Sequence, residues 1–423
     1  MKYDVIIIGA GAAGLMAMRD LLEAGHTVCM LEASSIAGGR IATINEPGFD
    51  MPIEAGAEFI HGKLPVTFKL IKEAGLSYEA VKGDMIGVQN GNWQKEEHDE
   101  HWDEFARQLE KLKTDLSIHQ FLEEYFSDPK YVHLRQAVQR MAEGFDLADI
   151  SKTSILSVKN EWKNIDKKQY RINGGYIGII NYLLDSCMQS SNTTINFNTC
   201  VCKIEYSKGH VIVHINDKKE FTASKLIITV SAGVLQSGAI QFKPELTDHA
   251  VAINSLGFGT VIKILLQFKT MFWKEYADNI GFLLTDEEIP TWWTQLPTEN
   301  NLLTGWLGGP AATKKAFESE ESLLKIALQS LSSIFHISID ILEEQLTHYK
   351  IINWLDKPYI KGGYCYNSLN SEQARKLLAT PVHNTLYFAG EALLDGGTVE
   401  DALKSGRNAA TRLIVQYTTQ KQE

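Results

Sequence analysis

The stretch Val5-Ile6-Ile7-Ile8-Gly9-Ala10-Gly11-Ala12-Ala13-Gly14 decides the fold. Four consecutive apolar residues favour a parallel strand that is buried on both faces. The glycines that follow form a GxGxxG motif, which allows a tight turn, close approach of the backbone to a pyrophosphate, and close packing of helix on strand. The N-terminus of the helix attracts the anion. We therefore predict a dinucleotide site that includes Gly9, Gly11, Ala13 and Gly14.

A second apolar strand, residues 28–31, ends at Glu32. A carboxylate at this point can bind both ribose hydroxyls and disfavours a 2′-phosphate, so NADP is not expected. The next residues include Gly38-Gly39-Arg40, which place a guanidinium where a loop would cross the pyrophosphate. Arginine binds phosphate through bidentate, charge-assisted hydrogen bonds. Because NAD dehydrogenases have no general need for such a loop, the sequence favours FAD.

The length of 423 residues is too great for one hydrophobic core, so we expect two domains. Trp102, Phe105, Leu109, Leu112 and Leu116 form one apolar helical stripe, and strand-like segments return from residue 195. A last apolar strand, 386–390, leads into a helix over 399–415, so both chain ends belong to one sheet. The predicted fold class is α/β, with a Rossmann-like FAD-binding domain and a substrate-binding domain of mixed sheet and helices. The FAD-binding domain comprises 1–75, 195–250 and 380–423, and the substrate-binding domain 76–194 and 251–379.

Composition excludes some partners. The net charge of 41 − 52 = −11 argues against nucleic acid, and it is compatible with cationic substrates as well as with solubility alone. Five cysteines without a CxxC pair indicate free thiols, and we expect no metal site. With no secretory signal at the start and no long apolar run, we expect a cytoplasmic location and no membrane association. The sequence is silent on oligomeric state.

Six segments together resemble the flavin amine oxidase family, which includes monoamine oxidases, polyamine and spermine oxidases, and lysine-specific histone demethylases. The segments are residues 9–40, 54–62 (EAGAEFIHG), 229–235, Lys263, 354–364 and 387–391. The long helical insertion and extra N-terminal domain of the demethylases are not expected in 423 residues without a heptad pattern. The motifs are most similar to those of polyamine and spermine oxidases.

The resemblance implies three groups of cofactor contacts. Contacts to the ADP half are expected from Glu32, Ala33, Gly39, Arg40 and Val201. Contacts near the isoalloxazine ring are expected from Gly56, Ala57 and Trp354. Contacts to the diphosphate, the ribityl chain and the pyrimidine edge are expected from Gly390, Glu391, Thr398 and Val399. Thr398 is also a good N-cap, and a helix N-terminus aimed at reduced flavin would stabilise its negative charge; an ordinary capped helix needs the same residues.

Three residues are the expected catalytic group. Lys263 lies in the apolar run 261–266, where a buried lysine needs a partner; in the family this lysine holds a water near flavin N5. A lysine that points outward from an edge strand is the alternative. Tyr364 is the expected aromatic wall that orients the amine, with Tyr366 as the competing candidate. His61 resembles the active-site histidine of animal polyamine oxidases and could bind or deprotonate an ammonium.

Two departures refine the expectation. Thr398 stands where monoamine oxidases have a second cage tyrosine, and Gly363 stands where they attach flavin through cysteine. The FAD is therefore expected to be non-covalent. The expected function is oxidation of a small, polyamine-like amine by hydride transfer to flavin N5, with O2 reoxidation giving H2O2, an aldehyde and an amine. The alternatives are a protoporphyrinogen-oxidase-like or desaturase-like flavoenzyme, and a flavin-binding protein without turnover.

Overall fold

The computed structural model describes residues 2–89, 91–95, 101–163 and 168–420. The central strand of its first sheet is β1 (Lys2–Ile8), the apolar run at the start of the chain. This strand pairs in parallel with β2 (Val28–Leu31) and with β13 (Glu220–Ile228). The strand order is β10-β2-β1-β13-β12-β11-β14, and β22 pairs in parallel with the end of β13. The other strands are β10 (Thr193–Asn196), β11 (Val201–Ser207), β12 (His210–Ile215), β14 (Gln241–Lys243) and β22 (Leu386–Phe388).

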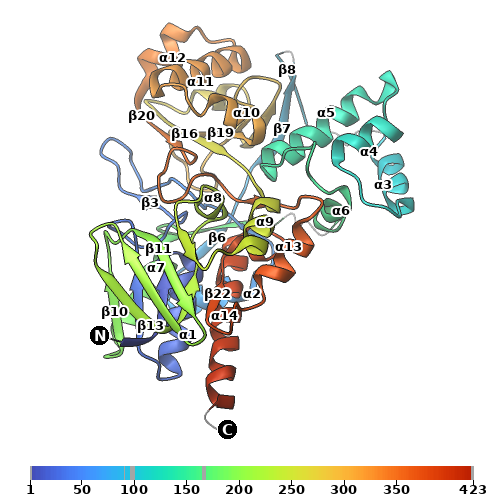
Figure 1. Cartoon of the computed structure of the whole chain (residues 1–423). Helices are drawn as coiled ribbons and strands as arrows, with labels where there is room; N and C mark the ends of the chain where they lie inside the picture. Colours follow the sequence, from blue (N-terminus) through green and yellow to red (C-terminus); the bar gives the residue numbers. More distant parts are fainter. Residues whose placement is uncertain (1, 90, 96–100, 164–167, 421–423) are drawn as a thin grey trace.

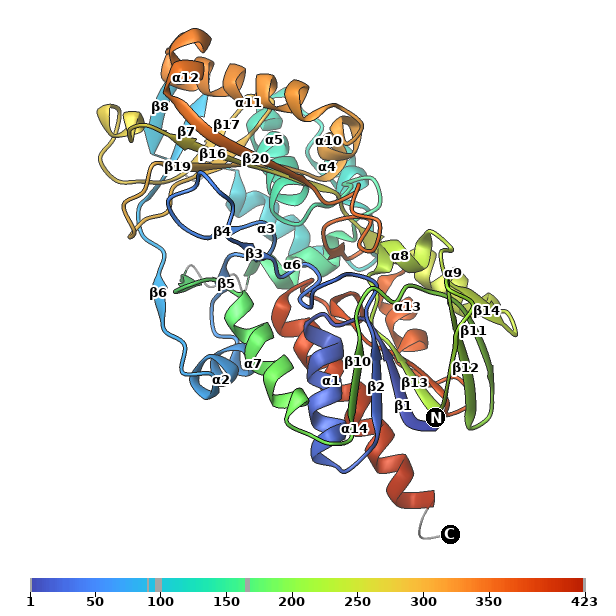
Figure 2. The same ribbon diagram turned by 90° about the vertical axis from the view of Figure 1, so that its left-hand side faces the viewer.

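One face of this sheet is covered by α1 (Ala12–Glu23), α7 (Ile177–Met188) and α14 (Val399–Gln420), with α2 (Pro65–Glu73) beside them. Figure 2 shows α1, α7 and α14 side by side against the strands. The predicted boundaries assigned α7 to the second domain, and this placement was wrong. The buried residues of α7 share one core with α1, because the helix precedes β10 and returns the chain to the first sheet.

The second sheet is mixed and has the order β20-β16-β19-β18-β17-β7-β8. Its strands are β7 (Asp84–Gln89), β8 (Asn92–Lys95), β16 (Val261–Phe268), β17 (Ile280–Thr285), β18 (Thr291–Trp293), β19 (Leu302–Gly308) and β20 (Leu346–Asn353). One face packs on α10 (Gly309–Lys315), α11 (Glu320–Phe335) and α12 (Ile339–Gln345). These elements lie at the top of Figure 1, away from both chain ends. β16 lies between β19 and β20, so it is an inner strand, and all eight of its residues are buried.

A third group of elements is helical and lies to the right in Figure 1. It contains α3 (Trp102–Lys111), α4 (Ile118–Tyr125), α5 (Val132–Arg140) and α6 (Ile155–Lys163), with a π-helix, η2 (Met141–Phe145), continuing α5. The apolar stripe from Trp102 to Leu116 predicted a single helix, but α3 ends at Lys111. The reason is local: Ser117 caps a new helix with Gln120 in a capping box, so the chain breaks between the two.

Short elements connect these layers. They are β3 (Thr43–Ile44), β4 (Ile53–Glu54), β5 (Ile60–His61), β6 (Tyr78–Ala80), β9 (Gln169–Ile172), α8 (Ala232–Gln236), α9 (Thr247–Ser255), β15 (Gly257–Phe258), β21 (Cys365–Tyr366), α13 (Ser371–Leu378), and the 3-10 turns η1 (Pro129–Tyr131), η3 (Phe272–Glu275) and η4 (Glu391–Leu393). The α/β fold class predicted from the sequence is confirmed. Of the described helices, none alone has the length and apolar composition to span a membrane; α11 and α12, bent by 111° where they meet, reach that threshold only as a pair.

Candidate active site

One cavity of about 2570 Å³ runs between the first sheet, the second sheet and the helical group. Every residue that we predicted for the site lines this cavity except Gly14. The residues brought together are Gly9, Gly11, Ala13, Glu32, Ala33, Gly39, Arg40, Gly56, Ala57, His61, Val201, Lys263, Trp354, Tyr364, Gly390, Glu391, Thr398 and Val399. The tertiary structure therefore gathers segments more than 300 residues apart around a single space.

The turn from β1 to α1 has the backbone of a nucleotide site. Gly9 has φ +104°, a conformation that disfavours a side chain. A Cβ on Gly14 would lie 2.0 Å from the carbonyl oxygen of Gly9, so the helix can approach the strand only with glycine there. The role of Gly14 is thus close packing. The Glu32 carboxylate accepts hydrogen bonds from the N–H of Ala10 (2.6 Å) and of Ser34 (2.8 Å), which hold it at the cavity wall. Burial raises the pKa of Glu32.

Arg40 and Glu391 form a bidentate ion pair inside the cavity wall. Arg40 donates to the two carboxylate oxygens at 2.6 and 2.7 Å, and it also donates to the Gly363 carbonyl at 2.8 Å. From the sequence we expected the Arg40 guanidinium to bind phosphate through two parallel hydrogen bonds. In the structure its two terminal nitrogens instead bind the Glu391 carboxylate. Arg40 thereby links the loop after β2 to the segment after β22. A Cβ on Gly390 would meet no atom of the described residues within 4 Å, so the backbone beside this pair faces open space.

Gly56 packs closely against two neighbours. A Cβ on this residue would lie 1.9 Å from the Arg40 carbonyl oxygen and 3.1 Å from the indole ring of Trp354, so only glycine fits there. Trp354 is itself held in place, since its Nε1 donates to the Ala55 carbonyl at 3.0 Å. Gly56 and Trp354 both line the cavity, so backbone and an indole ring form this part of its wall.

The N-terminus of α14 reaches the same cavity. Thr398 Oγ1 accepts from the N–H of Asp401 (3.1 Å), so the predicted cap forms. Glu400 lies in the first turn of α14. Its carboxylate accepts hydrogen bonds from the N–H groups of Val66 (3.1 Å) and Thr67 (2.8 Å). Glu400 therefore caps α2 and ties it to α14. The first turn of α14, with its positive dipole end, lies at the cavity end lined by Thr398.

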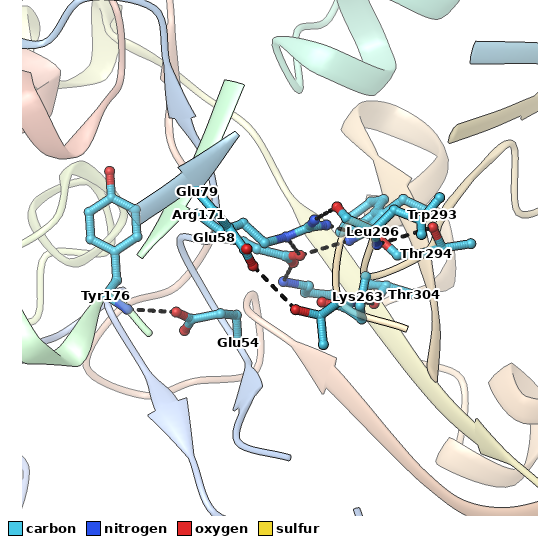
Figure 3. A network of polar contacts seen from close by, with 12 residues as sticks. Glu54, Glu58, Glu79, Arg171, Tyr176, Lys263, Trp293, Thr294, Leu296 and Thr304 are labelled. Atoms are coloured by element: carbon cyan, nitrogen blue, oxygen red, sulfur yellow. Dashed lines mark hydrogen bonds and ion pairs between the residues drawn. The ribbon is translucent and has the colours of Figure 1, made fainter. Parts of the chain in front are cut away.

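Lys263 is buried in an ion-pair network that the sequence analysis did not predict (Figure 3). Its Nζ lies 2.7 Å from Glu58 Oε2 and 3.4 Å from the Gly56 carbonyl oxygen. Because β16 is an inner strand, the alternative of an outward-pointing lysine on an edge strand is excluded. Glu58 also accepts from Arg171 (2.9 Å) and Trp293 (3.0 Å). With these donors on its oxygens, Glu58 is not free to meet a substrate ammonium.

Aromatic rings form another part of the cavity wall. Trp306 stacks on Tyr364 with ring centroids 6.5 Å apart, and Trp293 lies 5.8 Å from Trp306. The π-helix η2 holds this wall: the Gly144 carbonyl accepts from Trp306 Nε1 at 2.8 Å, and the Phe145 carbonyl accepts from the Tyr364 hydroxyl. Trp293, Trp306 and Phe145 were not predicted from the sequence, because they come from separate segments of the chain. For the two tryptophans, the alternation of side chains along β18 and β19 is the one sequence signal that could have indicated a shared face.

Two open questions of the sequence analysis concern Tyr366 and His61. Tyr366 packs in the core of the helical group and burial raises its pKa to about 12, whereas Tyr364 belongs to the aromatic wall. The packing thus favours Tyr364 as the cage residue. His61 lies against Phe145, with ring centroids 5.5 Å apart, and burial lowers its pKa to about 4. A histidine that stays neutral near pH 7 is a weak base and carries no charge. His61 is therefore better suited to hydrogen bonding than to proton abstraction.

These residues fit an extended dinucleotide that carries a planar ring. The α1 N-terminus and its glycines suit a pyrophosphate, Glu32 suits a ribose, and the part of the wall formed by Gly56 and Trp354 suits an isoalloxazine. The described residues contain no group of three or more histidine, cysteine, aspartate or glutamate side chains that could hold a metal ion.

Comparisons with known proteins agree with this geometry. The family model described as flavin containing amine oxidoreductase matches residues 12–414. Lysine-specific histone demethylase 1 homolog 3 of Arabidopsis thaliana is 24% identical over 498 residues, which cover 98% of this chain and 30% of the demethylase. Polyamine oxidase 4 of Oryza sativa subsp. japonica is 26% identical over 459 residues, which cover 99% of this chain and 90% of the oxidase. The chain spans only half the length of the mouse and human histone demethylases that it also matches.

The fold has close counterparts among solved structures. Cyclohexylamine oxidase from Brevibacterium oxydans IH-35A superposes with a TM-score of 0.82, covering 99% of this chain and 100% of the oxidase. The two sequences are 20% identical, so this likeness concerns the fold.

Proposed function

This chain belongs to the family of flavin-containing amine oxidoreductases, and from that premise we propose that it is an FAD-dependent oxidase of polyamine-like amines. The observation that carries the proposal is that the aromatic wall of Trp306 and Tyr364 lines the same cavity as Gly56 and Trp354. The nucleotide-binding residues and Lys263 line this cavity too. An aromatic wall can orient an amine against a planar cofactor.

The residues of the chain would position the reactants. FAD, when bound, would supply the oxidant: it would take a hydride equivalent from the carbon next to the amine nitrogen and pass the two electrons to O2, giving H2O2. The imine left behind would add water and split into an aldehyde and an amine. Tyr364 is held by its hydrogen bond to the Phe145 carbonyl and keeps one face of its ring on Trp306. His61, as a neutral imidazole, can donate or accept one hydrogen bond to an uncharged amine. The proximity of held reactants, with little reorganisation, is the main contribution of such a site.

Support for a polyamine-like substrate comes from charge as well as from the relatives. Glu143, Asp286, Glu287 and Glu288 are among the carboxylates that line the cavity, and Lys315, which also lines it, pairs with Glu288. A long amine with a second positive charge could place that charge near these groups while its reacting end meets the aromatic wall. One matched relative is named a polyamine oxidase.

We further propose that the FAD is non-covalent. Gly363 precedes Tyr364, so the tether position offers no thiol, and Cys365 is buried with its Sγ 3.8 Å from the Glu391 carbonyl oxygen. Acid precipitation should release all the flavin into the supernatant; flavin retained in the pellet would contradict this. The cytoplasmic location stays a prediction, which cell fractionation would test.

The test of the function is anaerobic mixing of the purified, FAD-loaded protein with a panel of amines. The panel contains spermine, N-acetylspermine, putrescine, cyclohexylamine, an L-amino acid and a methyllysine peptide. Rapid loss of flavin absorbance with the polyamines supports the proposal. If only the amino acid or the methyllysine peptide bleaches the flavin, the polyamine-like substrate class is wrong. If the protein is folded and FAD-loaded but no amine reduces it, amine oxidation is refuted and a flavoprotein of another kind is favoured.

A further inference from the structure

Three strands from two sheets supply donors to the Glu58 carboxylate. Glu58 lies between β4 and β5, Lys263 on β16, Arg171 on β9 and Trp293 on β18. Figure 3 shows the three donors converging on this one carboxylate. Oε1 accepts from Arg171 Nε at 2.9 Å and from Trp293 Nε1 at 3.0 Å, while Oε2 accepts from Lys263 Nζ at 2.7 Å. Each oxygen thus has a charged donor of its own.

The cluster of Lys263, Glu58 and Arg171 is buried and carries one net positive charge. The side chains of Lys263, Glu58 and Arg171 are 1%, 5% and 12% exposed, which is too little for water to screen them. Burial by itself would raise the pKa of Glu58, but the charges of Lys263 and Arg171 hold it below its ordinary value. Glu58 is therefore an anion between two cations. Removing its charge would leave both cations buried without a counter-ion, which is a costly arrangement.

The arrangement also directs the lysine. Glu58 and the Gly56 carbonyl take two of the three N–H groups of Lys263. Among the residues that the structure describes, no third acceptor lies within hydrogen-bonding distance, and Lys263 lines the cavity. The Nζ atom also lies 5.4 Å from the centre of the Trp293 ring, which closes one side. The remaining N–H is thus available to a molecule in the cavity beside Gly56.

We propose that Glu58 is a positioning residue, which holds the Lys263 ammonium and aims its remaining N–H at the flavin end of the cavity. Arg171 fixes the position of the Glu58 carboxylate through the hydrogen bond from its Nε. Arg171 is itself held, because its terminal nitrogens donate to the carbonyls of Leu296 (3.0 Å) and Thr294 (3.1 Å). This inference rests on the proposed function only for the place of the flavin. The polar contacts themselves belong to the protein alone.

The experiment is a double-substitution cycle with Glu58→Gln, Lys263→Met and the two combined. Each FAD-loaded protein is reduced with dithionite, so no amine substrate is needed, and reoxidation by O2 is followed by flavin absorbance. We expect Glu58→Gln to slow reoxidation about tenfold, the scale of one lost hydrogen bond to a charged group. In the Lys263→Met background, Glu58→Gln should change the rate less than about twofold.

Thermal unfolding of the apoproteins is a second readout, independent of flavin. The fall in Tm caused by Glu58→Gln should be at least halved in the Lys263→Met background, because one of the two stranded cations is then gone. If Glu58→Gln does not fold but the double variant does, that rescue supports the coupling. If neither variant folds, Glu58→Asp is the substitute, because it keeps the carboxylate charge on a shorter side chain. The flavin of Glu58→Asp should reoxidise more slowly than that of the unsubstituted protein.

Glu54→Gln is the matched control. Glu54 lies four residues earlier and bonds to the N–H of Tyr176 (2.7 Å) and to Thr43 Oγ1 (2.8 Å) instead of Lys263. It should leave reoxidation unchanged. Reoxidation of Glu58→Gln, or of Glu58→Asp in its place, within twofold of the unsubstituted protein would overturn the inference, as would effects of Glu58 and Lys263 that simply multiply. A protein that takes up no FAD would instead refute the proposed function.

Discussion

Substitution of Arg40 by methionine tests whether the two chain ends are joined by their ion pair. The guanidinium makes three hydrogen bonds, two of them to Glu391. Methionine keeps much of the length of the side chain and removes the charge and every donor. It leaves Glu391, whose side chain is 4% exposed, without its cation.

The expected cost follows from that burial. Removing one partner of a fully buried pair costs about 3–5 kcal/mol, because the remaining charge is left uncompensated. Arg40 keeps 26% exposure toward the cavity, so water partly screens the site. We therefore expect the lower end, about 3 kcal/mol, which corresponds to a fall in Tm of roughly 3–4 °C for a chain of this length.

Thermal unfolding of apoprotein by circular dichroism is the assay. Lys376→Met is the control, because the Lys376–Glu372 pair is 72% and 81% exposed and its loss should cost under about 0.5 kcal/mol. The double variant Arg40→Met with Glu391→Leu should recover at least half of the loss. A fall in Tm for Arg40→Met no larger than that of the control would refute the reasoning.

Three further predictions concern packing, substrate binding and pH. Gly14→Ala should abolish FAD retention, seen as loss of the flavin spectrum, because the new Cβ would lie 2.0 Å from the Gly9 carbonyl; normal FAD content would contradict this. Tyr364→Phe loses the hydrogen bond to the Phe145 carbonyl, about 1 kcal/mol, and should raise KM several-fold with little change in FAD affinity; an unchanged KM would exclude Tyr364 from the wall. Burial raises the pKa of Glu54 from its ordinary 4.5 to about 7, so the folded protein should lose roughly 2–3 kcal/mol as pH rises from about 4.5 to 7. Denaturant titrations of Glu54→Gln should lack this loss, and an identical pH dependence would rule out Glu54 as its source.

Much of the cofactor half of the site could be predicted from sequence because its chemistry is local. Gly9 to Gly14 must form a turn between strand and helix, and Glu32 must end the next strand. Such motifs depend on neighbours within about 30 residues, so one window of sequence contains the whole argument. The helix that the GxGxxG motif predicts after its strand is α1 (Ala12–Glu23), and the apolar run 261–266 lies within β16.

The substrate half depended on contacts that no window of sequence contains. Trp306 and Phe145 meet Tyr364, and Trp293 meets Trp306, only when β18, β19 and η2 pack around one cavity. His61 carries an ordinary imidazole in the sequence, and enclosure by the fold is what lowers its pKa to about 4. A pKa shift is a property of surroundings, so composition cannot supply it.

The sequence by itself determined the nucleotide-binding turn, the acidic strand end and the preference for FAD over NADP. Each follows from steric and charge requirements of adjacent residues. Only the tertiary structure decided the partners of the two key cations: Arg40 pairs with Glu391, and Lys263 pairs with Glu58. The physical reason is that a buried charge must find its counter-ion in space, and here the counter-ions lie 351 and 205 residues away along the chain.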